Sequence, residues 1–354
     1  AYYDPSDKTL NFCYDGNKSS RSNQYTVYNL NTGTNNPAWG SIASQVEWLY
    51  FYPSFKDYQP TTCYKWAYDM TNLKRVSFNG FNTSNVTNMG LMFYNCKNLT
   101  SLDVSGFDTA NVTNMDNMFG SCSSLTSINV SGFNTAKVTN MTGMFWGCSG
   151  LTSLNVSNFD TSNVTTMHGM FYGCSKLSTL DLSNFQIMKV KSFYRMFQGC
   201  SNLVTLKFGY RVSSSPATDM SYMFYGCTKL TTLDGYEMFN TANVTDMSYM
   251  FYNCSSLKTL NLNNYYISSS TNTSNMLSGL SSLTLLKISS TINSYLGASA
   301  CSGIGTASSP CTLDYQDITH PTFTTITPTY VVYKAGYFKS AKIKAYAQYY
   351  NNTL

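Results

Sequence analysis

The sequence predicts an α/β repeat solenoid of the leucine-rich-repeat type, with a parallel sheet of short strands, short helices, and β-rich caps at both ends. Three observations predict this fold. A cysteine recurs at a nearly constant interval, the residues around it repeat one pattern, and the two ends of the chain lack that pattern. Self-similarity at a fixed period of about 20 to 50 residues is the signature of repeat architectures.

The period follows from the marker cysteines, whose successive separations are 26 residues four times and then 27 residues twice. Extending the period places Met70 in the cysteine position before the series and Leu280 in the position after it. About nine repeats are therefore expected, and divergent repeats at the edges are typical of solenoids. The marker cysteines are Cys96, Cys122, Cys148, Cys174, Cys200, Cys227 and Cys254.

Each repeat contains two periodicities, which are clearest from Leu151 to Cys174. In the first half, Leu154 and Val156 alternate with Ser153 and Asn155, which predicts a short strand with one polar face. In the second half, apolar residues follow the spacing of one buried helix face, so a short helix is predicted. The apolar residues of that half are Val164, Met167, Met170, Phe171 and Cys174.

The predicted domain boundaries are those of the repeat. Residues 1–62 lack the period and read as a β-rich N-terminal cap, because strand-like pieces are broken by turn residues. Residues 63–295 carry the repeats. Residues 296–354 form a C-terminal cap, in which the alternating stretch 322–338 is expected to form a strand or hairpin that covers the last repeat.

The repeat unit L-T-S-L-x-V-S-x-F-x-T-x-x-V-T-x-M-x-x-M-F-x-x-C resembles the BspA-like leucine-rich repeat. That family comprises large surface proteins of oral and gut bacteria, mycoplasmas and some mucosal protists. The match covers about residues 63 to 290, and the repeat from Ser101 to Leu125 is a close example. The resemblance implies secretion or surface display and adhesion to host or neighbouring-cell molecules, and it brings no catalytic residues.

Composition agrees with a folded protein that has an unusually neutral surface. The chain of 354 residues is 43% apolar and 15% aromatic, and only 11% of its residues are charged, against roughly 25% in typical domains. The net charge of +5 is spread along the chain without a basic stripe, which argues against nucleic acid as a partner. No apolar run reaches the ~20 residues that a membrane span requires.

The cysteines have two different interpretations. The seven marker cysteines lack the close pairing of zinc ligands, so they are expected to be buried thiols and no metal is predicted. The other four lie in the caps, where an exported protein would gain from local disulfides, and either the bonded or the thiol form fits the sequence. The two candidate pairs are Cys13 with Cys63 and Cys301 with Cys311.

An enzymatic role has little support. Glycosidase chemistry needs two facing carboxylates about 5 to 9 Å apart. Asp103 and Asp181 share one strand row but lie three repeats apart, or roughly 14 Å at ladder spacing. No metalloprotease or serine-hydrolase motif occurs, so the protein is predicted to be non-enzymatic and to need no cofactor.

Two surface rows are candidate binding sites. Hydroxyl, amide and charged side chains on the outward side of the strands can hydrogen-bond a glycan or a peptide, or they are simply the solvated face of the sheet. This strand face comprises Ser127, Asn129, Ser153, Asn155, Thr179, Asp181, Thr205 and Lys207. Aromatic residues after the Met-Phe pair either stack on ligands or pack between repeats. This aromatic row comprises Tyr94, Trp146, Tyr172, Tyr225 and Tyr252.

These observations predict a secreted or cell-surface recognition or adhesion module that binds an extracellular protein or glycan through many weak contacts. One alternative is a structural spacer or a coat protein that self-associates. Another is an accessory carbohydrate-binding protein. The first would assemble with itself in the absence of a foreign ligand, whereas the second would lose polysaccharide binding when the aromatic row is mutated.

Overall fold

The computed structural model describes residues 1–209, 216–289, 296, 298–304 and 311–316. The chain divides into two compact units, Ala1–Phe185 and Gln186–Leu354. The stretch 322–338, which the sequence predicts to be a strand or hairpin, lies outside the described residues.

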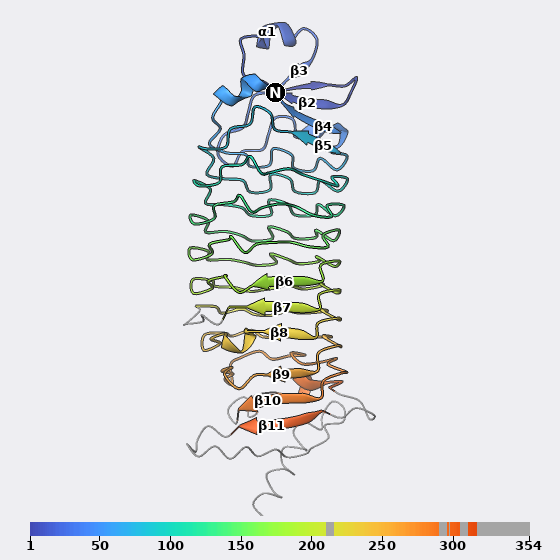
Figure 1. The fold of residues 1–354 in the computed structure, drawn as a ribbon, viewed down its shortest axis with the longest axis vertical. Helices are drawn as coiled ribbons and strands as arrows, with labels where there is room; N and C mark the ends of the chain where they lie inside the picture. The colour runs from blue at the N-terminus through green and yellow to red at the C-terminus, as the bar shows by residue number, and fades with distance from the viewer. Residues whose placement is uncertain (210–215, 290–295, 297, 305–310, 317–354) are drawn as a thin grey trace, which may run out of the picture. The chain divides into compact units, whose positions relative to one another are not determined.

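The first unit begins with a five-stranded sheet in the order β3-β1-β2-β4-β5 (Figure 1). Strand β1 pairs antiparallel with β2 and β3, whereas β4 pairs in parallel with both β2 and β5. The strands are β1 (Tyr2–Asp4), β2 (Thr9–Phe12), β3 (Thr26–Val27), β4 (Trp48–Phe51) and β5 (Arg75–Ser77). Short helical pieces connect them, namely α1 (Lys18–Arg21), η1 (Gly40–Gln45) and η2 (Pro53–Asp57).

Aromatic side chains fill the interior of this N-terminal part. The ring of Phe12 stacks on Phe51 and on Trp66, at centroid distances of 4.4 and 5.4 Å. Trp39 packs edge-on against both Phe12 and Trp66, and its indole N–H donates to the carbonyl of Trp66 at 2.9 Å. Because Trp66 belongs to the first repeat, these contacts give the N-terminal part and the repeats of this unit one continuous core.

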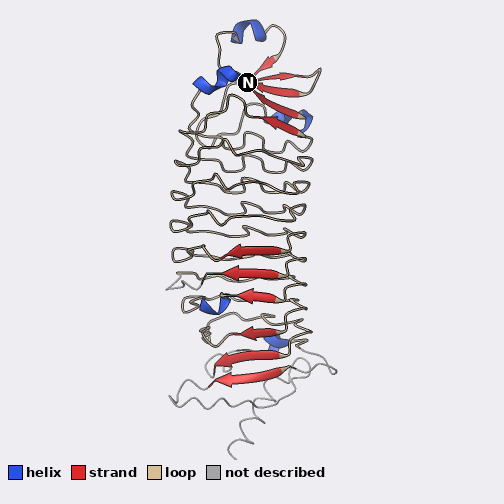
Figure 2. Cartoon of the chain, in the orientation of Figure 1, coloured by secondary structure: helices blue, strands red, loops and turns tan. Residues whose placement is uncertain are grey.

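The predicted helices do not form in the described repeats, which is the main correction to the expected fold (Figure 2). From Met141 to Cys148 the chain makes overlapping turns instead. The N–H groups of Met144, Trp146 and Cys148 donate to carbonyls three residues earlier in the same repeat, at 2.8 to 3.3 Å. The intervening N–H groups, starting with that of Gly143, donate to carbonyls of the next repeat at 2.6 to 2.9 Å.

The cause is a pair of left-handed residues, four positions apart, in this segment of each repeat. Gly143 has φ +57° and Gly147 has φ +67°, and the equivalent residues of other repeats also have positive φ. An α-helix requires φ near −60° throughout, whereas a type II turn requires a left-handed residue at its third position. The apolar spacing of these segments therefore marks the buried corners of consecutive turns, and the solenoid is built of β-structure and turns.

The half of the repeat that was predicted to be a strand forms a paired strand in only some of the described repeats. In the first unit, β6 (Thr179–Leu182) is a strand, whereas 101–104, 127–130 and 153–156 keep the alternating burial without strand pairing. In the second unit β7 pairs in parallel with β8, and β10 pairs in parallel with β9 and β11. These strands are β7 (Thr205–Phe208), β8 (Thr232–Asp234), β9 (Thr259–Asn261), β10 (Leu285–Ser289) and β11 (Thr312–Gln316), and η3 (Tyr236–Met238) and η4 (Ala298–Cys301) are short 3-10 turns.

A buried threonine links successive repeats. Thr109 is 1% exposed, its hydroxyl donates to the carbonyl of Asn134 at 3.0 Å, and it accepts from the N–H of Asn134 at 2.8 Å. Thr83 and Thr241 make the same pair of bonds to the repeat that follows each of them. Each of these hydroxyls satisfies both backbone groups of one residue, which explains why the unit carries a threonine after F-x.

We expect Thr109→Val to destabilise the first unit by about 1 to 3 kcal/mol, because it leaves a backbone N–H and a carbonyl without their partner. Urea unfolding followed by circular dichroism measures the loss. Thr113→Val is the matched control, since Thr113 is exposed and its hydroxyl makes one bond of 3.2 Å to Thr87. Equal losses in the two variants would contradict a role for the buried bonds.

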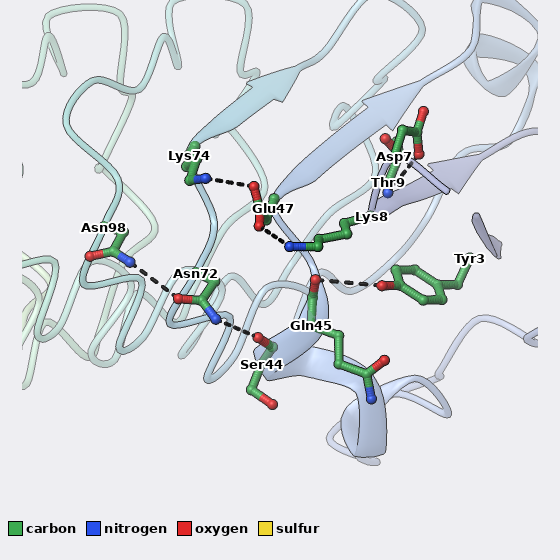
Figure 3. A network of polar contacts seen from close by, with 10 residues as sticks. All are labelled: Tyr3, Asp7, Lys8, Thr9, Ser44, Gln45, Glu47, Asn72, Lys74 and Asn98. Carbon is green, nitrogen blue, oxygen red and sulfur yellow. Dashed lines mark hydrogen bonds and ion pairs between the residues drawn. The ribbon is translucent and has the colours of Figure 1, made fainter. Parts of the chain in front are cut away.

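Glu47 joins three segments of the N-terminal sheet (Figure 3). Its two carboxylate oxygens each lie 2.6 Å from an ammonium nitrogen, one of Lys8 and the other of Lys74. Nearby, the amide of Asn72 donates to the carbonyl of Ser44 and accepts from the amide of Asn98. Hydrogen bonds from Lys74 and Lys8 lower the pKa of Glu47 from 4.5 to about 2.

We expect the Glu47 ion pairs to stabilise the first unit above about pH 4.5 and to lose their effect as the pH falls toward 2. The sign follows because a carboxyl whose pKa is lowered by folding stabilises the fold wherever it is ionised. Unfolding midpoints of the wild type and Glu47→Gln should therefore differ at pH 7 and converge near pH 2. A difference that is independent of pH would show that the charge is not responsible.

Candidate recognition surface

The strand face is exposed as the alternation requires. Ser127 and Asn129 are exposed, whereas Ile128 and Val130, which alternate with them, are 8% and 1% exposed. The first unit brings six of the predicted residues together on its 127–130, 153–156 and β6 segments, and all six are exposed. These six are Ser127, Asn129, Ser153, Asn155, Thr179 and Asp181. In the second unit, Thr205 of β7 is half-buried and Lys207 is exposed.

Local hydrogen bonds orient the Asn and Asp side chains of this face. The side-chain oxygens of Asn129, Asn155 and Asp181 each accept from the N–H two residues later, at 3.1, 3.0 and 2.9 Å. Such Asx turns hold the side chain against its own backbone. A ligand that hydrogen-bonds these groups therefore loses less side-chain entropy than it would with freely rotating residues.

The aromatic row forms stacks that run between repeats. Tyr94 stacks on Tyr68 at 5.4 Å, Trp146 on Tyr172 at 4.1 Å, and Tyr225 on Tyr252 at 4.9 Å, with interplanar angles of 10 to 17°. Each of these rings thus has one face covered by its neighbour and is half-buried. Packing between repeats therefore accounts for the recurrence of aromatic residues at this position.

Sequence reasoning missed a second group of aromatic residues in the second unit. Tyr222 stacks on Tyr249 at 4.8 Å, and the guanidinium carbon of Arg195 lies 5.4 Å from the Tyr222 ring and 4.7 Å from the Tyr194 ring. Arg195, Tyr222 and Tyr249 all occupy the first left-handed position of the repeat. Arg195 therefore meets the Tyr222 ring, and Tyr222 the Tyr249 ring, because that position is stacked from one repeat to the next.

The N-terminal end of the strand face was also missed. Trp48 of β4 is 40% exposed, and the guanidinium of Arg75 on β5 lies 4.6 Å from its ring. Tyr50 is half-buried on the same side of β4 as Trp48 and packs edge-on against Tyr52 at 4.8 Å. The alternation in Trp48–Phe51 was the available signal, and it extends the polar strand face into an aromatic and cationic surface.

The marker cysteines are buried, and several also donate hydrogen bonds. The thiols of Cys122, Cys148 and Cys254 point at the carbonyls of Phe93, Phe119 and Phe224, at sulfur-to-oxygen distances of 3.0 to 3.1 Å. Burial raises the pKa of Cys254 to about 12. In the part of the chain that the structure describes, no three His, Cys, Asp or Glu residues gather in a way that could hold a metal ion.

The cap cysteines differ in their surroundings. Cys13 is half-buried and Cys63 is buried. Cys301 and Cys311 are both buried, and burial raises the pKa of each to about 12, with the neighbouring Cys311 adding to the effect on Cys301. Disulfides between Cys13 and Cys63 and between Cys301 and Cys311 remain predictions.

The repeats match one protein family over most of their length. The family is described as a Mycoplasma protein of unknown function, DUF285, and its model matches residues 61–154, 128–232 and 210–290. The chain belongs to the DUF285 family. This membership confirms the resemblance found in the repeat unit, and the DUF285 repeats coincide with the turns and extended segments described above.

Solved structures that resemble this DUF285 chain include bacterial leucine-rich repeat proteins. A leucine-rich repeat protein from Bacteroides ovatus is 15% identical, covering 77% of this chain and 84% of its own, with a TM-score of 0.24. A leucine-rich cell surface protein from Faecalibacterium prausnitzii is 16% identical over 77% of each chain, with a TM-score of 0.29.

No curated protein matches the chain. Among the residues that the structure describes, no helix has the length and hydropathy that crossing a membrane would demand.

Proposed function

We propose that this protein is a non-enzymatic recognition module, secreted or displayed on the cell surface, that binds an extracellular protein or glycan through its strand face. The observation that supports the proposal is the regular array of exposed hydroxyl, amide and carboxylate groups on the first unit, whose Asn and Asp members are held by Asx turns. The resemblance of the repeat unit to surface proteins supports the surface location.

Each group on this surface would contribute little by itself. The strand face repeats similar groups at about 4.8 Å per paired strand, so an extended ligand can contact several repeats at once. The low proportion of charged residues, 11%, favours hydrogen bonding over long-range electrostatic attraction. An accessory carbohydrate-binding role through the aromatic row has less support, because a neighbouring ring already covers one face of each stacked ring.

The test is binding of the purified protein to an array of extracellular-matrix proteins, mucins and purified glycans. We expect saturable binding that is lost when Ser153, Asn155, Thr179 and Asp181 are all changed to alanine. A matched control changes four exposed polar residues away from the strand face, Asn111, Thr113, Lys137 and Thr139, and should bind as the wild type does.

Failure to bind any member of the array would contradict the proposal. If sedimentation then showed concentration-dependent assembly without a foreign ligand, the structural or coat-protein role would replace it. Equal loss of binding in the strand-face variant and the control would instead assign the effect to general destabilisation. Urea unfolding of both variants separates loss of a contact from loss of the fold.

A further inference from the structure

A groove with a volume of about 410 Å³ opens in the first unit, between β5 with its following turn and the 103–107 segment of the next repeat. Its apolar walls are Val76, Phe78, Phe81 and Phe107, and its polar rim includes Asn79 and Asp103. The volume falls within the range of ligand sites in proteins. Asp103 occupies the same position in its repeat as the strand-face residues Asn129, Asn155 and Asp181, but none of the groove residues is among the strand-face or aromatic-row residues named from the sequence.

The groove arises from a difference between two repeats. At three equivalent positions, the side chains of the first repeat are partly exposed and those of the next repeat are buried. Leu102, Val104 and Phe107 are 8%, 1% and 4% exposed. Their equivalents one repeat earlier are half-buried, and these are Val76, Phe78 and Phe81. Phe78 and Phe81 contact the buried Phe107 ring edge-on at 4.8 and 5.3 Å, so the two half-buried rings lie against a third ring that the core holds in place.

The backbone of the first repeat is held toward the N-terminal sheet. Strand β5 pairs with β4 along one edge, and the 101–104 segment of the next repeat is not a strand. Gly80 follows β5 and is packed against the backbone of Tyr52 and Pro53. Phe81 also packs toward the N-terminal sheet, because its ring lies 4.6 Å from the ring of Phe51 on β4.

The rim carries one negative charge. Asp103 is exposed, and its Oδ1 accepts from the N–H of Ser105 at 3.0 Å. Hydrogen bonds from the Ser105 hydroxyl and N–H lower the pKa of Asp103 below its usual value, so this carboxylate is ionised at neutral pH. None of the ion pairs in the described part of the chain involves Asp103. The guanidinium of Arg75 lies over the Trp48 ring.

We propose that this groove binds an extended peptide segment of a partner protein, with an apolar side chain on Phe78 and Phe81 and a lysine or arginine on Asp103. This proposal rests on the recognition function proposed above, and it specifies the chemical groups of one partner. The half-buried rings of Phe78 and Phe81 suit an apolar group better than a hydroxylated sugar, and the carboxylate selects a cation over an anion. A peptide carries both groups on neighbouring residues.

The probe is a fluorescein-labelled peptide, Ser-Phe-Ser-Lys-Ser, compared with the same peptide carrying Glu or Gln in place of Lys. Fluorescence polarisation with the full chain at low salt should show the Lys peptide binding about tenfold more tightly than the Glu peptide, which corresponds to about 1.4 kcal/mol. Added salt should reduce the preference, because Asp103 is exposed.

Two variants locate the site. Asp103→Asn should abolish the preference for Lys over Glu, and it preserves the fold because Asn129 fills the same position one repeat later and makes the same Asx turn. Phe78→Ser should weaken the binding of all three peptides. The matched control is Asp108→Asn, since Asp108 is also an exposed carboxylate in an Asx turn and the next repeat has Asn134 there.

Three results would overturn the proposal: no binding of the Lys peptide, equal binding of the Lys and Glu peptides, or the same effect of Asp108→Asn and Asp103→Asn. A peptide with the sequence of residues 333–344, which combines aromatic residues and lysines, tests a second copy of this chain as the occupant. If that peptide bound more tightly than the probe, the proposed occupant would be a second copy of this chain and not a foreign protein. The strand-face alanine variant should still bind the Lys peptide, so failure here and failure of the array test are distinguishable.

Discussion

Replacing Phe145 by alanine is expected to destabilise the first unit by about 3 to 5 kcal/mol, a large fraction of the stability of a typical domain. Phe145 is fully buried, and its ring lies in a stack of parallel rings, 5.7 Å from Phe119 and 5.9 Å from Phe171. The variant therefore leaves a cavity at the contact between three repeats. Since a repeat is stabilised mainly by its neighbours, the damage should extend to both adjoining repeats.

Urea unfolding by circular dichroism gives the free energy, and hydrogen exchange shows how far the loss of protection extends from residue 145. Ser127→Ala, at an exposed position, should change stability by less than about 0.5 kcal/mol. A loss below about 1 kcal/mol for Phe145→Ala would mean that the repeats collapse into the cavity, and it would contradict the rigid stack.

Gly80→Ala is expected to cost about 3 kcal/mol, at the upper end of what overpacking usually costs. A Cβ at this position would overlap the carbonyl oxygen of Tyr52, 2.8 Å from its carbonyl carbon and 3.1 Å from the Cα of Pro53. All three are backbone atoms, so no side chain can rotate away. The substitution should separate the first repeat from the turn that follows β4.

The control for Gly80→Ala is built into the repeat, because Gly106 occupies the same position 26 residues later and a Cβ added there would meet no atom within 4 Å. Gly106→Ala should therefore leave the unfolding midpoint almost unchanged. If both variants lost the same stability, a shared conformational effect of glycine would explain the result and the close approach to Tyr52 would not.

The sequence was most informative where side-chain chemistry repeats. The positions of the marker cysteines define the 26-residue unit, and the alternation of Ser153 and Asn155 with Leu154 and Val156 predicted which side of the extended segments faces solvent. Both predictions depend only on which side chains avoid water, and that preference is a property of each residue type. The DUF285 match confirms the family on the same residues.

The same spacing could not distinguish a helix from a run of turns. Met141, Met144, Phe145 and Cys148 are buried in either case, because consecutive turns and a helix both bring every third or fourth residue to the core. The left-handed residues at 143 and 147 were the available signal, and glycine there marks the third position of a type II turn. Asn117 and Ser121 take the same conformation one repeat earlier, so residue type by itself was ambiguous.

By itself, the sequence determined the repeat, the family and the polar character of the strand face, because periodic side chains report burial directly. Only the tertiary structure decided how the segments between strands hydrogen-bond and where the regular stacking opens. The stack of rings at Phe145, the approach of Gly80 to Tyr52 and the groove beside Asp103 arise from contacts between residues about 26 positions apart. Such contacts depend on how each repeat sits on its neighbour, and that geometry is set by packing.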